Sequence, residues 1–282
     1  MILLLKISLV IFIAGNLFEM GLLMNPRAAI SGLRNYRFVC YTLLWSFVVG
    51  PTVAFGLSIL IPLDPAYAMG LVLMGLSPCA PFLPMLVKKA QGDLGYTAAF
   101  MLIASLGTVF FMPIAVPLLV QGLTVSSWAI AKPLLITLLI PLTVGMAILR
   151  HSQVVAQKIL PAVKKVILGF TLSTLALSVL VYGKGLFQID ALNVFAALIL
   201  FFASLTLLSY WLGVGLRSNQ KIVLSMGVTT RNLGASVAPL LSLPLVDEKT
   251  IVIIVMGAPV MIGSALLHAK FIHRTEPGTQ FN

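Results

Sequence analysis

The sequence predicts an all-α polytopic membrane protein, and three observations support this fold class. Of the 282 residues, 60% are hydrophobic and 9% are charged, and the mean hydropathy is +1.11. Apolar runs of roughly 18 residues or more recur along the whole chain, and a run of that length crosses a bilayer as a helix. Two of the runs are interrupted near their middle by Pro, Gly and polar residues. A water-soluble fold does not fit this composition.

Nine transmembrane helices are predicted, in a single transmembrane domain that covers residues 1–282. The first apolar run is longer than the apolar region of a cleavable signal peptide, so we interpret it as a span. Cys40 and Cys79 fall in apolar segments of different helices, where a disulfide framework is not expected. The predicted spans are residues 2–24, 37–61, 66–90, 94–120, 127–149, 162–183, 191–215, 220–243 and 250–272.

The distribution of basic residues predicts the orientation of these spans. The formal net charge is +11, and 13 of the 18 Lys and Arg residues fall in alternate loops and the carboxy-terminal segment. Because cytoplasmic loops carry the excess of Lys and Arg, we expect the amino terminus outside and the carboxy terminus in the cytoplasm of a cell (inner) membrane. The positive charge is interpreted as a topology signal, and no nucleic-acid partner is expected.

The third and eighth predicted spans are the interrupted ones. Pro78, Pro81 and Pro84 remove three backbone donors from the third span, so a continuous helix is not expected there. The eighth span carries Gly, Thr, Arg and Asn residues within 227–234. In lipid, freed backbone groups are tolerated only against protein or a watery cavity, so we interpret each span as two half-helices that meet inside the protein. The alternative for either break is a Pro or Gly kink without a role in transport.

The positions of the two breaks predict an inverted repeat. The broken spans are five apart, and because five is odd the second copy has the opposite orientation in the membrane. The two copies cover about residues 2–120 and 162–272, with the fifth span between them. Inverted repeats with two helices broken at the membrane midplane are typical of secondary transporters.

Two charged residues lie away from the span ends. Arg231 falls near the centre of the eighth span, and Glu19 lies within the first. A charge at that depth costs on the order of 3 kcal/mol, so both are candidate ligands for a substrate or ion. Asn16 lies one turn from Glu19 on the same face, so we expect the two to face one cavity and Glu19 to take up a proton, unless it pairs with Arg231. The alternatives are a structural tie from Arg231 to freed carbonyls and a Glu19 side chain that reaches cytoplasmic water.

The amino termini of the half-helices, together with Arg231, predict a negatively charged substrate, because unpaired amides and a fixed cation both attract anions. Hydroxyl, amide and thiol groups that would orient the substrate lie beside both breaks, at Thr229, Thr230, Asn232, Ser77 and Cys79. For the two threonines the alternative is a hydrogen bond back to their own helix.

Signatures of enzymes and ATP-driven pumps are missing from the sequence. His151, His268 and His273 form no HExxH motif, the seven acidic residues include no paired-Asp metal site, and no P-loop occurs. We therefore expect no catalytic residues, no bound metal and no cofactor. A channel and a membrane-anchored enzyme are the rival classes.

Four segments resemble the bile acid:sodium symporter family, in its bacterial, nine-helix form. They are FEMGLLM (18–24), GLVLMGLSPCAPFLPMLVKKAQGDLGYTAAF (70–100), FFMPIAVPLL (110–119) and GVTTRNLGAS (227–236). The resemblance implies a panel of residues 2–24 and 127–183 and a core of residues 37–120 and 191–272, in which the broken helices cross. It also implies alternating-access transport of organic anions, including bile acids and short keto acids, usually driven by sodium.

The sequence departs from the family at the cation sites. Family members carry Ser-Asn after the first break, where this chain has Leu83 and Pro84, and Glu followed by Gln-Asn at the second break, where it has Gly227, Arg231 and Asn232. Sodium needs several oxygen ligands, whereas a guanidinium only donates hydrogen bonds and stays protonated. The usual sodium sites are therefore in question, and we expect Arg231 to replace sodium as the fixed positive charge. Sodium or proton coupling of a carboxylate symporter, and a sodium-independent exporter, are the alternatives.

Overall fold

The computed structural model describes residues 2–24, 26–120, 126–182, 191–242 and 246–275, and helices make up almost all of this part of the chain. No strand occurs among these residues. The elements are α1 (Ile2–Leu23), α2 (Pro26–Leu33), α3 (Tyr36–Leu44), η1 (Trp45–Val49), α4 (Gly50–Leu60), α5 (Pro65–Gly75), α6 (Leu83–Lys89), α7 (Leu94–Leu119), α8 (Ser127–Leu134), η2 (Leu135–Leu139), α9 (Ile140–His151), α10 (Gln153–Tyr182), α11 (Ala191–Trp211), α12 (Ser218–Thr229), α13 (Leu233–Val237), η4 (Ala238–Ser242) and α14 (Glu248–Thr275).

Six helices in the described ranges are long and apolar enough to cross a membrane. They are Leu3–Leu23, Tyr36–Leu60, Leu94–Leu119, Ser127–His151, Leu192–Trp211 and Glu248–Ile272. The other three predicted spans correspond to the two broken segments and to α10, whose 30 residues also include the basic stretch before the predicted sixth span. The all-helical membrane fold is confirmed, whereas nine spans and an inverted repeat stay predictions.

Several helices begin at a polar residue whose side chain accepts a backbone N–H. Asp64 caps α5 at the Ala66 amide, directly before Pro65, and Asp93 caps α7. Asn35 and Ser126 cap α3 and α8. A side-chain oxygen at this position satisfies one of the four amides that a helix start leaves open, and proline at the next position loses no hydrogen bond. These caps place the helix starts close to where the sequence pattern predicts them.

A π-helical turn interrupts two of the long helices, one between α3 and α4 and one between α8 and α9. In η1 the Gly50 amide donates to the Trp45 carbonyl, five residues earlier, and the following residue, Pro51, has no N–H to donate. The turn η2 likewise ends two residues before Pro141. The missing proline donor explains the local widening, since the normal bond four residues back cannot form there.

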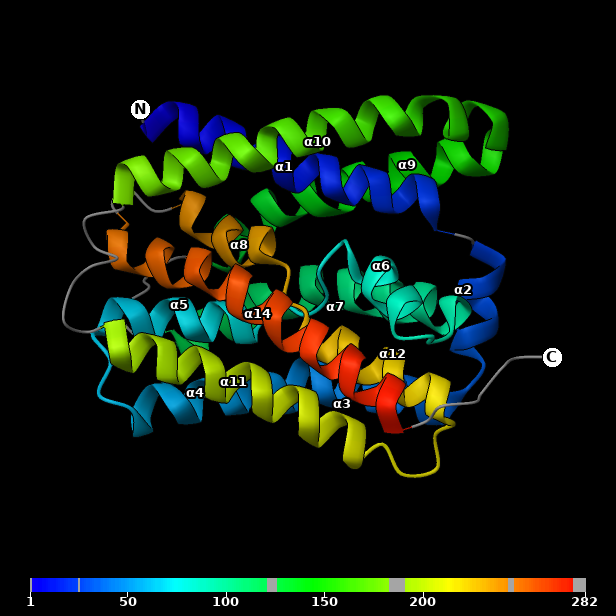
Figure 1. The fold of residues 1–282 in the computed structure, drawn as a ribbon. Coiled ribbons are helices and arrows are strands. Elements are labelled where there is room, and N and C mark those ends of the chain that lie inside the picture. Colours follow the sequence, from blue (N-terminus) through cyan, green and yellow to red (C-terminus); the bar gives the residue numbers. More distant parts are fainter. Residues whose placement is uncertain (1, 25, 121–125, 183–190, 243–245, 276–282) are drawn as a thin grey trace.

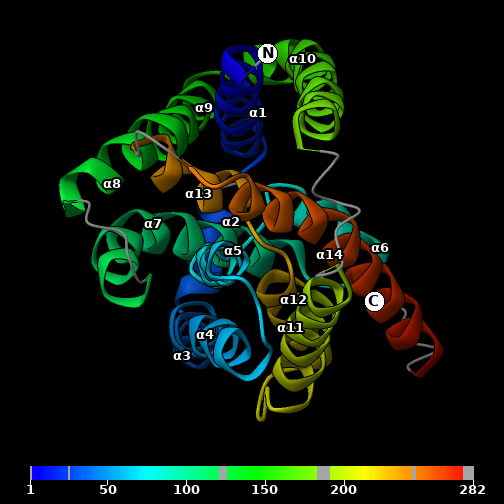
Figure 2. The same cartoon turned by 90° about the vertical axis from the view of Figure 1, so that its left-hand side faces the viewer.

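In the view along their axes, the helices form one layer and a larger group beneath it. Figures 1 and 2 show α1, α9 and α10 together as one layer, with α5, α7 and α14 beneath it and α3, α4 and α11 on the far side. The short helix α13 and the turn η4 lie between the layer and the rest of the molecule. Ile13 of α1 packs against Gly234 of α13, so the layer touches the segment that follows the second break.

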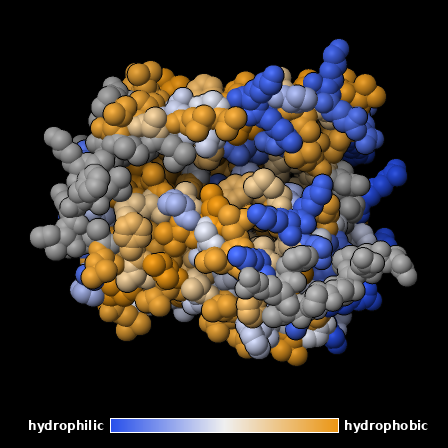
Figure 3. All heavy atoms as spheres, in the orientation of Figure 1, coloured by the Kyte–Doolittle hydropathy of each residue, from blue (hydrophilic) through white to orange (hydrophobic). Residues whose placement is uncertain are grey.

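Hydrophilic residues gather at one end of the molecule. On the face in Figure 3 they lie toward the right, where α2 and the ends of α6 and α14 are found in Figure 1. Exposed basic residues lie in the helix ends and connections at this end and in the first half of α10. They are Arg27, Arg34, Arg37, Lys88, Lys89, Arg150, Arg217, Lys158, Lys164 and Lys165.

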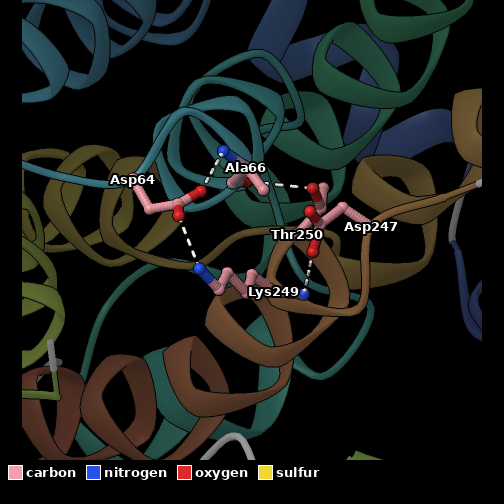
Figure 4. A network of polar contacts seen from close by, with 5 residues as sticks. All are labelled: Asp64, Ala66, Asp247, Lys249 and Thr250. Atoms are coloured by element: carbon pink, nitrogen blue, oxygen red, sulfur yellow. Dashed lines mark hydrogen bonds and ion pairs between the residues drawn. The ribbon is translucent and has the colours of Figure 1, made fainter. Parts of the chain in front are cut away.

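At the opposite end, a polar network joins the starts of α5 and α14 (Figure 4). The Lys249 ammonium donates to Asp64 Oδ2 at 2.5 Å, and the Thr250 hydroxyl donates to the Ala66 carbonyl at 3.0 Å. Asp247 caps α14 by accepting the Lys249 amide at 2.9 Å. The network fixes the first half of the broken third segment against α14.

Candidate binding site at the two helix breaks

Both interrupted segments are broken where the sequence predicts, and the two breaks are in contact. The first break lies between Gly75 and Leu83, and the second between Thr229 and Leu233. The Cys79 amide donates to the Thr230 carbonyl at 2.8 Å, and the Asn232 amide donates to the Ser77 carbonyl at 2.9 Å. These two bonds form a short antiparallel bridge, which pairs backbone groups that the breaks free from their helices.

The first break takes its shape from prolines and from one strained residue. Pro78, Pro81 and Pro84 cannot donate to the helix ladder. Cys79 adopts φ +71°, a left-handed conformation that a non-glycine residue rarely takes. The bridge to Thr230 holds the Cys79 backbone in place, so the residue has a structural role here, and its buried thiol contacts the Ala80 carbonyl at 3.7 Å.

Side chains also join the two breaks. The Ser77 and Ser236 hydroxyls share a hydrogen bond of 2.5 Å between buried side chains, and Ser77 also donates within α5, to the Leu73 carbonyl at 3.0 Å. The side chain of Asn232 caps α13 by accepting the Ala235 amide at 3.0 Å. Ser77 and Asn232 therefore hold the junction together.

Arg231 is the largest fully buried side chain among the described residues. Its Nη1 donates to the Gly75 carbonyl at the end of α5, at 3.1 Å, and the guanidinium carbon lies 5.2 Å from the centre of the Phe201 ring on α11. The guanidinium also packs against Gly50 at the start of α4. The guanidinium therefore lies between α4, α5 and α11.

The charge of Arg231 has no carboxylate partner in the described part of the chain. Two of its nitrogen atoms, Nε and Nη2, are buried and make no hydrogen bond there. Its bond to Gly75 corresponds to the structural alternative, a tie to a carbonyl freed by a break. A tie of one nitrogen leaves two donors unmatched, and a buried charge without a partner is strongly unfavourable. This side chain is the chemically unusual feature of the junction.

The two threonines at the end of α12 hydrogen-bond to carbonyls of their own helix. This is the alternative to a role in binding substrate that the sequence analysis gives for them. Thr229 donates to the Ser225 carbonyl at 2.7 Å, and its hydroxyl lies 2.7 Å from that of Thr206 on α11. Thr230 donates to the Gly227 carbonyl at 3.3 Å. Both threonines are fully buried, and the hydroxyl partners that the structure shows for them are groups of α11 and α12.

Glu19 and Asn16 of α1 lie apart from the junction. Glu19 is partly exposed and forms an ion pair with Lys164 of α10, with 3.8 Å between Oε1 and Nζ. The Asn16 amide donates to the Phe12 carbonyl at 2.7 Å, within α1. The ion-pair partner of Glu19 is thus Lys164 and not Arg231, and the structure does not bring these two candidates together with the others.

The positions at which the resemblance places family cation ligands are filled by apolar groups. Gly227 lies against Phe100 of α7 so closely that an added Cβ would be 2.5 Å from the ring. Leu83 is fully buried in the hydrophobic core. Oxygen ligands for sodium are therefore missing at these two positions, consistent with the sequence departures.

Three residues that contact Arg231 were not singled out from the sequence. Gly50, Gly75 and Phe201 lie in separate predicted spans, and apolar residues at such positions are indistinguishable from ordinary core. The Gly50-Pro51 pair in the second span was a usable signal, because proline frees carbonyls and glycine permits close approach.

Comparison with known proteins supplies the family. The profile of the Sodium Bile acid symporter family matches residues 10–192, well over half of the chain, and the chain belongs to this family. Its members are membrane transporters, so the protein is a multi-pass membrane transporter. The match ends before α12, so Arg231 lies outside the matched residues. No curated protein matches the chain.

Proposed function

We propose that the protein is a secondary active transporter of small organic anions that works by alternating access, with Arg231 as the fixed positive charge at the binding site. The observation that carries the proposal is the fully buried guanidinium at the junction of the two breaks, with Nε and Nη2 unpaired. An anionic substrate would supply the charge and acceptors that the protein does not.

The arrangement of helices supports a division into two moving parts. We take α1, α8, α9 and α10 as the panel, and the two broken segments with α3, α4, α7, α11 and α14 as the core. The core would be the more rigid part, since the bridge at the breaks and the network at Asp64 tie its helices together. Rocking of such parts about a fixed site is the usual basis of alternating access in inverted-repeat transporters.

The exposed basic residues at one end support the orientation. Because Lys and Arg accumulate on the cytoplasmic side, we place the ends of α6 and α14 in the cytoplasm and the start of α1 outside. The Asp64 network then lies at the external end.

Sodium would not be needed for substrate binding. A sodium ion beside the Arg231 guanidinium would meet uncompensated repulsion in a low-dielectric interior. Phe100 occupies the space at Gly227 where a carboxylate ligand would have to stand. Proton coupling through Glu19 is the second candidate, favoured by its half-buried position in α1 beside Lys164.

The test is uptake and binding of anions by purified protein in proteoliposomes, with and without sodium. Pyruvate and cholate serve as a short keto acid and a bile acid. We expect Arg231→Lys to weaken binding, because an ammonium cannot form the two-pronged bond of a guanidinium to a carboxylate, and Arg231→Ala to abolish it. The matched control is Arg217→Ala, at an exposed arginine of the α11–α12 connection.

Sodium should make little difference to the parent protein, and the thermal midpoint of each variant shows whether it is folded. Saturable binding that requires sodium, or normal binding by a folded Arg231→Ala protein, would contradict the proposal. The protein would then be an ordinary sodium symporter.

A further inference from the structure

Helix α10 presents one exposed stripe along its length. Residues three and four apart in a helix lie on the same face. Lys158, Pro161, Lys165, Leu168 and Leu172 follow this spacing, and all five side chains are exposed. The stripe is therefore basic in its first half and aliphatic in its second.

The two lysines of this stripe form no ion pair in the part of the chain that the structure describes. The next residue along the helix, Lys164, lies about 100° around the helix axis from Lys165. It pairs with Glu19 of α1, with 3.8 Å between Nζ and Oε1. The carboxylate nearest to this helix is thus already matched, and the charge of Lys158 and Lys165 is open to a partner outside the protein.

Distances along α10 place these lysines at a membrane surface. At 1.5 Å per residue, Lys165 lies about 26 Å and Lys158 about 36 Å from Tyr182, where the helix ends. The hydrocarbon core of a bilayer is about 30 Å thick, and the headgroup layers extend it to about 40–45 Å. A helix that crosses from Tyr182 therefore has Leu168 and Leu172 in the hydrocarbon, Lys165 at its edge and Lys158 among the headgroups.

The direction of the helix brings the two ammonium groups toward each other's level. Side chains of an α-helix tilt toward its amino terminus, so the Lys165 side chain extends from the hydrocarbon edge toward the headgroups. The two Cα atoms are about 10 Å apart along the axis, and two flexible lysine stems can meet at one phosphate. The first half of α10 lies at the end of the molecule where hydrophilic residues gather, which we place in the cytoplasm (Figures 1 and 3).

The two halves of the stripe define the chemistry of the partner. A soluble anion would match the lysines and leave the leucines uncovered. A zwitterionic lipid would cover the leucines, but its headgroup brings no net charge to the lysines. A phospholipid with a net negative headgroup matches both halves, and basic clusters on the cytoplasmic side of membrane helices attract such lipids.

We propose that the exposed stripe of α10 binds an anionic phospholipid of the cytoplasmic leaflet. Lys158 and Lys165 hold its phosphate, and its acyl chains lie along Leu168 and Leu172. This inference goes beyond the proposed function, because none of these residues belongs to the junction of the helix breaks. Since α10 belongs to the panel, the lipid anchors the panel at one membrane surface while the core moves.

The experiment measures lipid binding by the thermal midpoint of the purified protein in a neutral detergent. The probes are dioctanoyl phosphatidylglycerol, which is anionic, dioctanoyl phosphatidylcholine, which is zwitterionic, and glycerol phosphate, which has the charge without the chains. Because a ligand that binds the folded state raises the midpoint, saturation of the shift gives the half-saturating concentration. The midpoint without lipid shows whether each variant is folded.

The test variant is Lys158→Gln/Lys165→Gln. Its matched control is Lys88→Gln/Lys89→Gln, which removes the same charge from two exposed lysines at the end of α6. A third protein, Lys158→Arg/Lys165→Arg, keeps the charge of the stripe.

We expect phosphatidylglycerol to give a saturable shift in the parent that high salt weakens, and phosphatidylcholine to give a smaller one. Lys158→Gln/Lys165→Gln should raise the half-saturating concentration of phosphatidylglycerol roughly thirtyfold, because each lysine near an anionic headgroup contributes about fivefold. The arginine variant should bind like the parent, and the control should change binding little.

Three results would overturn the inference. One is an equal shift with both lipids, which would make the stripe an ordinary lipid-facing surface. Another is an equal loss of binding in the test variant and in Lys88→Gln/Lys89→Gln, which would make the effect one of net charge alone. The third is saturation by glycerol phosphate at the concentrations at which phosphatidylglycerol saturates, which would assign the lysines to a soluble anion. Transport of anions by the Arg231 variants bears on none of these results, so the two proposals fail separately.

Discussion

Gly227 and Phe100 give the sharpest test of the packing that replaces a family cation ligand. An alanine Cβ at position 227 would lie 2.5 Å from Cε1 and 2.6 Å from Cζ of Phe100. Carbon atoms prefer about 3.5–4.0 Å, so the ring has to move by roughly 1 Å. Phe100 is fully buried and cannot turn toward the membrane or water.

The expected magnitude follows from two opposing terms. Replacing glycine by alanine inside a helix favours folding by about 0.5–1 kcal/mol. Overpacking a filled core costs about 1–3 kcal/mol. We therefore expect Gly227→Ala to destabilise the folded protein by up to about 2 kcal/mol, whereas Gly56→Ala, which meets no atom, should be neutral or slightly stabilising.

The assay is thermal unfolding in detergent of the parent, the two single variants and a Gly227→Ala/Phe100→Leu double variant. Because the smaller leucine leaves room for the new methyl group, the double variant should be more stable than the sum of the single effects implies. If Gly227→Ala and Gly56→Ala have the same midpoint, the space at Gly227 is open and the packing argument is wrong.

Two further predictions concern the ion pairs. The hydrogen bonds from the Lys249 ammonium and, second, from the Ala66 amide lower the pKa of Asp64, so its contribution to stability is present above the unfolded-state pKa of about 4 and is lost as the pH falls through the lower folded value. Asp64→Asn should lower the thermal midpoint near neutral pH and flatten its decrease in acid, and an unchanged acid profile would contradict this. Glu19→Gln should alter the pH dependence of transport if Glu19 takes up a proton, whereas uptake with an unchanged pH profile would exclude that role.

Much of the candidate site could be predicted from the sequence, because helix breaks are caused by residues at the break itself. Proline removes a donor wherever it stands, so Pro78 and Pro84 mark the first break without knowledge of the fold. Arg231 was evident because a charge in an apolar segment is expensive. The contact between the two breaks could be predicted by comparing the two interrupted spans. The backbone hydrogen bonds of Cys79 and Asn232 confirm this contact.

The direction in which Arg231 points was not predictable. It depends on Gly50, Gly75 and Phe201, which come from three other helices and have no polar signal of their own. Residues 26–33 fall between the first two predicted spans, where the sequence predicts no helix, and they form α2. Both cases depend on tertiary contacts, which local propensity does not encode.

A fixed guanidinium changes how a transporter can cycle. A sodium ion that binds with the substrate also leaves with it, so the empty carrier returns without that charge. Arg231 stays in the protein, and its side chain is fully buried without a carboxylate partner in the described residues. Closing the site around an unpaired charge costs several kcal/mol, whereas closing it around a bound carboxylate does not, because the anion compensates the charge. Under the proposed function, the loaded carrier therefore changes orientation more readily than the empty one. This asymmetry favours exchange of one anion for another over net uptake, so the substitution at this position bears on the mode of transport as well as on the choice of coupling ion.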